Sequence, residues 1–321
     1  MLQLKKKERL KVVKVFAKTA KMDRTQWLME RRKGICGSDA SVVLGINPYH
    51  SILYLWKEKT GELLIEESGN QYTYFGNVLE PVVKKEFTKR TGLKVRAKNA
   101  ILQSGEYPFM LADLDGIVKD ENGELAIFEA KTASAYKEDV WKKGVPEEYI
   151  AQVQHYLCVT GFKKAYVCAL VGGNSFYYHE IYRDEEYIKD LVAKEKAFWD
   201  CIQKKILPAL DGSQATVDYI NQTYPTSNHK DMELPFGAEQ LISSYLDVEA
   251  SIKTLTTQKN ALANQLKDMM KENEKGYAGD HIVKWTTITK QSLDTTKVKE
   301  ALGNDYDDYL QTSSYRKFSV A

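Results

Sequence analysis

The chain has 321 residues, of which 43% are hydrophobic and 28% are charged. This composition is typical of a globular protein with one large domain or two smaller ones. The formal net charge is only +2, so nucleic-acid binding would depend on local clusters of basic residues. No apolar run approaches the length of a transmembrane helix, and the basic start MLQLKKKERLKVVKVF lacks the apolar core of a signal peptide. We therefore expect a cytoplasmic protein without membrane partners.

The cysteines argue against a local metal cluster. Cys36, Cys158, Cys168 and Cys201 are far apart in the sequence, and none forms a C-x-x-C pair. This spacing argues against a zinc ribbon or an iron–sulfur cluster built from local motifs, and buried thiols are expected instead. The sequence also contains no glycine-rich phosphate loop and no internal repeat, so it does not support a nucleotide-driven motor.

The N-terminal part alternates basic and apolar residues and then turns helical. Residues 1–20 fit either an edge strand or a loosely held basic arm, and the sequence does not decide between them. Asp23 can cap a helix that stops at Gly34, Ser38-Asp39 can cap a second, and a third is expected around 53–59. A serine at a helix start beside an arginine can bind phosphate. The alternative is a capping serine near a solvated basic helix end.

A stronger helical pattern covers residues 75–90. Its apolar side chains fall on one side, and Gly92 follows its end. Glu80 lies beside that apolar side. Its carboxylate is therefore either on the helix flank in water or turned inward toward a positive partner.

Residues 112–132 predict a β-hairpin that carries acids and a lysine. Asn122-Gly123 lies between two strand-like runs, which is a strong hairpin signal. Side chains at i and i+2 on a strand share a face, so Glu129 and Lys131 point the same way. If the runs pair, Asp115 comes from the neighbouring strand and lies near Glu129.

Two carboxylates and a lysine in this arrangement suit metal-assisted phosphate chemistry. Carboxylate oxygens are the ligands that Mg²⁺ or Mn²⁺ prefers. An ammonium next to them can hold a nucleophile or a phosphate. A surface hairpin with solvated charges is the alternative interpretation of these residues alone.

The following segment alternates helix and strand. A helix is expected over 149–159, with Gln152 and Tyr156 one turn apart on one face. Two strands, 165–173 and 176–183, then precede a long amphipathic helix that runs from about residue 184 to 205. This order indicates an α/β (α+β) core with a central mixed sheet flanked by helices.

The weakly patterned stretch 207–225 suggests a domain boundary near residue 210, which separates 1–210 from 211–321. A heptad helix is expected over about 237–275, followed by a strand at 281–289, a short helix capped near Thr295 or Thr296, and a strand at 313–321. The heptad pattern predicts packing against another long apolar stripe, in the same chain or in a second copy, and the sharper expectation is self-association. The heptad positions are Leu241, Tyr245, Val248, Ile252, Leu255, Lys259, Leu262, Leu266 and Met269.

Several short motifs follow one another in an order that resembles a known family. The sequence is similar to the PD-(D/E)XK nuclease superfamily, and specifically to the YqaJ-type phage recombination exonucleases related to lambda exonuclease. The resemblance covers about residues 24 to 205, and Leu114 replaces the proline of the superfamily name. The motifs are Arg31 with Ser38, GNVLEP at 76–81 with Glu80, Asp115-Gly116, Glu129-Ala130-Lys131, and Gln152 with Tyr156.

The resemblance implies a restriction-endonuclease-like core and a set of functional residues. Lys131 would orient or activate the attacking water. Arg32 competes with Arg31 for the phosphate pocket, and Asp113 is a spare acid near Asp115. By resemblance, Glu80, Asp115, Glu129 and the backbone carbonyl of Ala130 bind Mg²⁺, for which Mn²⁺ can substitute, and Arg31, Ser38 and Gln152 bind a DNA 5′-phosphate.

The function implied by the resemblance is a 5′→3′ exonuclease. It would digest one strand of linear double-stranded DNA and leave a 3′ tail for phage-type recombination. The expected partners are double-stranded DNA ends, a single-strand annealing protein and further copies of the chain, a trimer by resemblance, in the bacterial host cytoplasm. The alternatives are an endonuclease on the same core and a non-catalytic DNA-end-binding scaffold.

Overall fold

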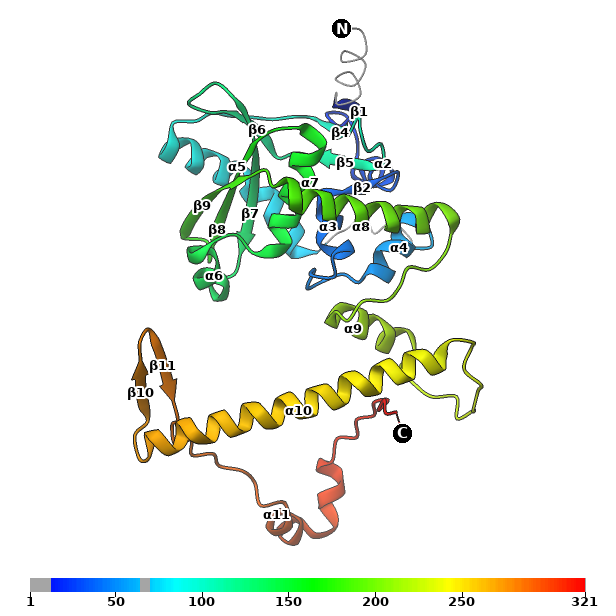
Figure 1. The fold of residues 1–321 in the computed structure, drawn as a ribbon, viewed down its shortest axis with the longest axis vertical. Coiled ribbons are helices and arrows are strands. Elements are labelled where there is room, and N and C mark those ends of the chain that lie inside the picture. The colour runs from blue at the N-terminus through cyan, green and yellow to red at the C-terminus, as the bar shows by residue number, and fades with distance from the viewer. Residues whose placement is uncertain (1–12, 64–69, 321) are drawn as a thin grey trace. The chain divides into compact units, whose positions relative to one another are not determined.

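A computed structural model describes residues 13–63 and 70–320 of the chain (Figure 1). The chain divides into two compact units, Met1–Thr223 and Tyr224–Ala321, which we call the core unit and the C-terminal unit. The boundary predicted near residue 210 precedes helix α9, which belongs to the core unit. No helix in the described ranges is long and apolar enough to cross a membrane.

Two β-sheets form the centre of the core unit. One has the strand order β3-β6-β7-β8-β9, and the other has the order β1-β4-β5-β2. Strand β7 pairs antiparallel with β6 and parallel with β8, which confirms the expected mixed sheet in an α/β fold. The strands are β1 (Lys14–Lys18), β2 (Ile35–Cys36), β3 (Val95–Arg96), β4 (Ala100–Gln103), β5 (Met110–Asp113), β6 (Gly116–Lys119), β7 (Leu125–Ala133), β8 (Lys164–Val171) and β9 (Ser175–Tyr182).

Helices cover both faces of the five-stranded sheet (Figure 1). Phe87 of α5 packs against Phe128 on one face, and Leu157 of α7 packs with Ile127 on the other. Ile127 and Phe128 are adjacent on β7 and therefore point to opposite faces of the sheet, because side chains alternate along a strand. The helices of the core unit are α2 (Arg24–Arg31), α3 (Gly37–Val43), α4 (Ile52–Thr60), α5 (Gln71–Thr91), the 3₁₀ turn η1 (Ala135–Lys137), α6 (Glu138–Lys143), α7 (Glu147–Thr160), α8 (Glu185–Lys204) and α9 (Gln214–Thr223).

The N-terminal expectations are largely confirmed. Strand β1 lies at the edge of its sheet and pairs with β4, as one of the two interpretations predicted; residues 1–12 lie outside the described ranges. Asp23 caps α2 with a reciprocal capping box. The predicted cap at Ser38 is wrong, because α3 begins at Gly37 and Cys36 is its N-cap.

Helix α9 was missed because its capping signal lies in a turn-rich stretch. Ser213 Oγ accepts a hydrogen bond from the Thr216 backbone N–H over 3.2 Å, and Asp211 accepts one from the Ser213 hydroxyl over 2.6 Å. These bonds satisfy donors at the helix start. The apolar residues that follow are too few to give a clear helical period.

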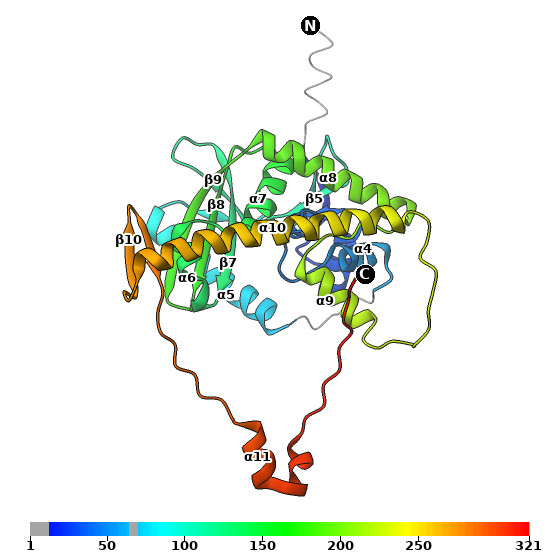
Figure 2. The ribbon, with the colours of Figure 1, turned by 60° about the horizontal axis from the view of Figure 1, so that its bottom comes forward.

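The C-terminal unit is built around one long helix, α10 (Ala238–Met270), which Figure 2 shows unbroken. It ends before the predicted residue 275, because Lys275 already begins a β-hairpin. The predicted strand at 281–289 stops at Lys284, and the predicted final strand is wrong for the described residues 313–320. The short helix was predicted correctly, although Asp294 caps it. The remaining elements are β10 (Lys275–Ala278), β11 (His281–Lys284), α11 (Thr295–Leu302) and η2 (Gly303–Tyr309).

The heptad side chains of α10 are exposed. Val248, Ile252, Leu255 and Leu262 each expose between 58% and 63% of their surface. Isolated exposed apolar residues are normal, but a continuous heptad stripe along a helix of 33 residues is typical of a coiled-coil interface.

We predict that the full-length protein self-associates through this stripe. Leu262→Asp places a charge in the interface and should lower the weight-average mass in sedimentation equilibrium. Asn264→Asp is the matched control, because it adds the same residue two positions away on the opposite side of the helix. Equal masses for the two variants would contradict the prediction.

Candidate active site

The hairpin β6–β7 brings the two acids of the predicted metal site together. Gly116 pairs with Phe128 in the antiparallel register, so Asp115 comes beside Glu129 at the end of the ladder. Asp115 Oδ2 accepts a hydrogen bond from the Ala130 backbone N–H over 2.8 Å. The carboxylate of one strand is therefore held directly against the backbone of the other.

Gly116 is required by the close approach of a neighbouring strand. A Cβ atom at this position would lie 2.4 Å from Val95 Cγ1 on β3. Glycine thus lets β3 pack against β6. The Asp-Gly pair of the sequence motif therefore combines a functional acid with a packing requirement.

Glu129, Lys131 and Gln152 form one hydrogen-bonded cluster. Lys131 Nζ donates to Glu129 Oε1 over 2.8 Å and to Gln152 Oε1 over 2.9 Å. Gln152 Nε2 donates to the same Glu129 oxygen over 2.7 Å. The Lys131 ammonium also lies 4.7 Å from the centroid of the Tyr149 ring. The i, i+2 spacing on β7 thus places acid and lysine together as predicted, and α7 supplies the amide.

Burial sets the charge states of this cluster. Burial and the neighbouring Glu129 raise the pKa of Asp115 well above its usual range. Burial also raises the pKa of Glu129, although Lys131 opposes the shift. Burial alone would lower the pKa of Lys131, but Glu129 and Asp115 outweigh it and raise the pKa. The two carboxylates therefore favour the ammonium form of Lys131, which donates hydrogen bonds to Glu129 and Gln152.

The chemistry of Asp115 and Glu129 fits a divalent cation. Glu129 is 2% exposed, and its Oε2 atom has no hydrogen-bond partner among the described residues. A buried carboxylate oxygen without a donor is costly. A cation would satisfy it and would also neutralise the repulsion between the two acids. These two carboxylates are hard oxygen ligands of the kind that Mg²⁺ accepts.

Glu80 is not part of that cluster in this structure. Its carboxylate is hydrogen-bonded to Lys84 on the same helix, and α5 covers the face of the sheet opposite α7. Among the described residues, no group of three or more His, Cys, Asp or Glu side chains could hold a metal ion. Glu80 nevertheless lies close enough for its charge to raise the pKa values of Asp115 and Glu129, as a weaker effect than burial.

The structure pairs Ser38 with Arg31. Arg31 Nη2 donates to Ser38 Oγ over 2.6 Å, and the guanidinium lies 4.5 Å from the centroid of the Trp27 ring. Arg32 instead donates to the backbone carbonyl of Leu63. Arg31 is thus the arginine that shares a site with Ser38, at the junction of α2 and α3.

Asp113 serves the arginine side of the site. Its Oδ2 atom accepts a hydrogen bond from Trp27 Nε1 over 2.5 Å. Trp27 is the residue on which the guanidinium of Arg31 stacks. This spare acid therefore orients Trp27 and adds negative charge near Arg31.

Tyr156 links the two halves of the site, a role that its position in the sequence did not show. Its hydroxyl accepts a hydrogen bond from Gln152 Nε2 over 3.1 Å. Its ring packs against the start of α3, where a Cβ on Gly37 would lie only 2.3 Å from the ring. One tyrosine therefore spans the distance between the Glu129–Lys131 cluster and the helix that carries Ser38. The Gly37–Tyr156 contact could not be found without the fold.

A buried hydrogen-bonded pair fixes the helix that carries Gln152 and Tyr156. His155 contacts Glu195 Oε1 of α8 over 2.8 Å and the carbonyl oxygen of Leu111 on β5 over 2.9 Å. Both side chains are fully buried. Helix α7 is thus tied to α8 and β5, which holds its functional face toward β7.

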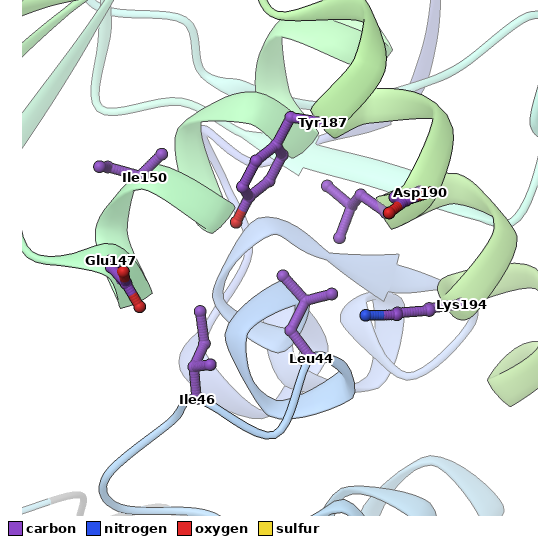
Figure 3. A pocket seen from close by; sticks show the side chains of 8 residues that line it. Leu44, Ile46, Glu147, Ile150, Tyr187, Asp190 and Lys194 are labelled. Carbon is purple, nitrogen blue, oxygen red and sulfur yellow. The ribbon is translucent and has the colours of Figure 1, made fainter.

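A cavity beside α7 and α8 does not contain these residues. It has a volume of about 490 Å³ and is lined by apolar and charged side chains of the segment that follows α3 and of α7 and α8 (Figure 3). Because no member of the Glu129–Lys131 cluster lines it, cavity size does not identify the chemical site. The lining residues are Leu44, Ile46, Glu147, Ile150, Tyr187, Asp190, Leu191 and Lys194.

Comparison with known proteins assigns the family. A family profile described as the YqaJ-like viral recombinase domain matches residues 26–163. The uncharacterized protein YqaJ of Bacillus subtilis (strain 168) is 41% identical over 315 residues, which cover 97% of this chain and 98% of that protein. This chain belongs to the YqaJ-like viral recombinase family. The predicted resemblance is confirmed, and the profile includes every site residue named above except those of α8.

Solved structures with a similar core have low sequence identity to this YqaJ-like chain. The alkaline exonuclease LHK-Exo from Laribacter hongkongensis is 18% identical, with a TM-score of 0.47, and covers 62% of this chain and 97% of its own. Its complex with dAMP is 19% identical, with a TM-score of 0.48 and the same coverage. A phage related exonuclease from Haemophilus somnus 129PT is 15% identical, with a TM-score of 0.42, and covers 54% of this chain and 96% of its own.

We predict that Asp115→Asn increases the free energy of unfolding of the metal-free protein at neutral pH. Asparagine keeps an acceptor for the Ala130 N–H and removes one of two adjacent buried negative charges. The pKa of Asp115 is higher in the folded than in the unfolded protein. Its contribution to the free energy of unfolding is therefore fully present below its pKa in the unfolded state, and it is lost as the pH rises through its pKa in the folded state. The gain from asparagine should therefore grow with pH.

Urea denaturation in EDTA from about pH 4 to about pH 9 measures this difference. Asp120→Asn in the hairpin turn is the matched control with the opposite sign. Although burial opposes the shift, hydrogen bonds from the Glu124 N–H and from Lys164 lower the pKa of Asp120. Asp120 therefore stabilises the folded protein at pH values above its pKa in the unfolded state, and Asp120→Asn should lower the free energy of unfolding in that pH range. A destabilising effect of Asp115→Asn at every pH would contradict the prediction.

Proposed function

We propose that this YqaJ-like protein is a metal-dependent nuclease that digests one strand of linear double-stranded DNA from its 5′ end and leaves a 3′ single-stranded tail. The observation that carries the proposal is the buried Glu129–Lys131–Gln152 cluster, which has Asp115 beside it and an unpartnered Glu129 oxygen. Family membership and the alkaline exonuclease activity named for LHK-Exo are consistent with it.

The residues that would hold Mg²⁺ or Mn²⁺ are Asp115 and Glu129, together with the backbone carbonyl of Ala130. The carboxylate of Glu80 would join them by exchanging its hydrogen bond to Lys84 for the cation. A divalent cation bound there would supply Lewis-acid polarisation of the scissile phosphate. Lys131 contributes a fixed positive charge where negative charge develops and orients the attacking water by hydrogen bonding. Gln152 and Tyr149 hold the ammonium in place for this role.

The Arg31–Ser38 pair would bind the terminal 5′-phosphate. A guanidinium carries five N–H donors, so one bond to Ser38 leaves further donors for phosphate oxygens. Gln152 belongs to the Glu129–Lys131 cluster and is hydrogen-bonded to Tyr156, whose ring packs against the start of the helix that carries Ser38. Because one tyrosine separates the two sites, a bound end would place a nearby phosphodiester at the acids. This arrangement supports digestion from 5′ ends.

The product of such digestion is a 3′ single strand, which suits a single-strand annealing protein as the partner in phage-type recombination. The proposed setting is the cytoplasm of a bacterial host. Self-association of the chain, as expected from α10 and from the family resemblance, would keep several cutting centres together on one DNA molecule.

The test uses linear duplex DNA with a 5′-phosphate and a label on either the 5′ or the 3′ end of one strand. With Mg²⁺, a 5′ label should be released first. A 3′ label should stay on its strand while that strand is shortened from the 5′ end. Covalently closed circular DNA should stay intact, and its cleavage would favour an endonuclease on the same core. DNA binding without cleavage in Mg²⁺ and in Mn²⁺ would favour an end-binding scaffold and contradict the proposal.

We predict that Lys131→Ala lowers the rate of digestion by about a hundredfold or more, because a fixed charge at a developing anion contributes at least this much. Lys163→Ala is the control, since Lys163 is an exposed surface lysine paired with Glu124. Initial rates on the labelled linear duplex measure both variants. A Lys131→Ala enzyme with the wild-type rate would remove Lys131 from the mechanism.

A further inference from the structure

Lys59 is a buried cation for which the proposed mechanism has no use. It lies in the last turn of α4, and its side chain is 1% exposed. Its Nζ atom lies 2.6 Å from Asp39 Oδ2 and donates to the backbone carbonyl of Arg31 over 3.0 Å. A lysine is rarely buried unless it is paired. Lys59 is therefore built into the region that carries the proposed phosphate clamp, Arg31 and Ser38.

Asp39 stands between the two cations of this region. Its Oδ2 atom accepts a hydrogen bond from the Cys36 backbone N–H over 2.8 Å and contacts Lys59. Its Oδ1 atom lies 3.5 Å from Ser38 Oγ, which in turn accepts the bond from Arg31. One hydroxyl group thus separates the Asp39 carboxylate from the Arg31 guanidinium.

This geometry makes Asp39 a competitor for Arg31. A buried carboxylate demands a positive partner, and Lys59 and Arg31 are the two cations whose charges lower its pKa, against the opposing effect of burial. While Lys59 occupies Oδ2, the guanidinium remains on Ser38. Without the charge of Lys59, Arg31 is the remaining strong cation at hand for Asp39, and an internal ion pair would replace the phosphate contact.

We propose that Lys59 is a positioning residue that neutralises Asp39 and thereby keeps Arg31 available to the DNA 5′-phosphate. The inference rests on the proposed function, because it assigns the Arg31–Ser38 pair to the terminal phosphate. It adds a residue on α4 that determines preference for phosphorylated ends without touching DNA.

The inference predicts different outcomes for the two halves of one ion pair. Lys59→Met and Asp39→Asn both break the pair, and both leave a buried partner alone, so both lower stability. Only Lys59→Met leaves a negative charge that attracts Arg31. Asp39→Asn removes that charge and leaves Arg31 on Ser38. A purely structural ion pair would affect both variants alike.

The measurement is the affinity of the full-length protein for 5′-phosphorylated and 5′-hydroxyl duplex ends, by fluorescence anisotropy in EDTA. Wild type should prefer the phosphorylated end, and Arg31→Gln should lose that preference. Lys59→Met should reduce the ratio of the two affinities by about tenfold or more, the loss of a hydrogen bond to a charged group. Asp39→Asn should keep the ratio within about twofold of wild type, which is the usual range of context effects.

Two further variants keep the test decisive. The double variant Asp39→Asn with Lys59→Met removes both charges, so Asp39 no longer competes for Arg31 and the wild-type ratio should return. Replacement of a whole buried pair is also often neutral for stability. Lys59→Gln retains an amide donor for the Arg31 carbonyl and lacks the charge, so it stands in for Lys59→Met if that variant does not fold. Lys57→Met on the same helix is the matched lysine control. Circular dichroism confirms that each variant is folded at the assay temperature.

The outcomes separate the inference from the function on which it rests. Equal loss of preference in Lys59→Met and Asp39→Asn, or an unchanged ratio in Lys59→Met, overturns the inference and leaves the phosphate clamp standing. A wild-type protein that binds both ends equally overturns the clamp, and the role of Lys59 falls with it. Loss in Lys59→Met with recovery in the double variant supports the inference.

Discussion

The burial of Glu129 is the constraint on which the rest of the site depends. Its side chain lies on a central strand between two layers of helices. One oxygen receives hydrogen bonds from Lys131 and Gln152, and the other has no partner within residues 13–63 and 70–320. A carboxylate in such a place is costly unless a positive charge accompanies it. The lysine two residues along the strand meets part of that demand, and Asp115 increases it. A further cation would therefore lower the cost of burying these two acids, which is why we propose a metal here.

Helix α7 couples this centre to the region of Arg31 and Ser38. It supplies Gln152 to the acid and Tyr156 to the start of α3, and the buried pair of His155 with Glu195 holds the helix in place. The two regions that we propose to bind different parts of one substrate are thereby kept at a fixed spacing. A fixed spacing is what an enzyme acting from a chain end requires, because orientation of the substrate contributes much of the rate.

Acidic and basic side chains lie close together on both sides of Tyr156. In the Glu129–Lys131 cluster, with Asp115 beside it, two acids lie around one lysine. The negative charge that remains suits a metal cation. At the clamp two cations, Arg31 and Lys59, lie beside the buried acid Asp39, and Asp113 adds a second negative charge near Arg31.

Local patterns in the sequence were sufficient for the features that depend on near neighbours. Strand period places Glu129 with Lys131, the Asn-Gly turn sets the hairpin beside Asp115, and the heptad spacing predicts α10, since these signals act within a few residues. Only the tertiary structure decided which arginine meets Ser38, and that Lys59 pairs with Asp39 across 20 residues of chain. Such contacts are set by how helices pack, and one sequence does not encode packing in any local period.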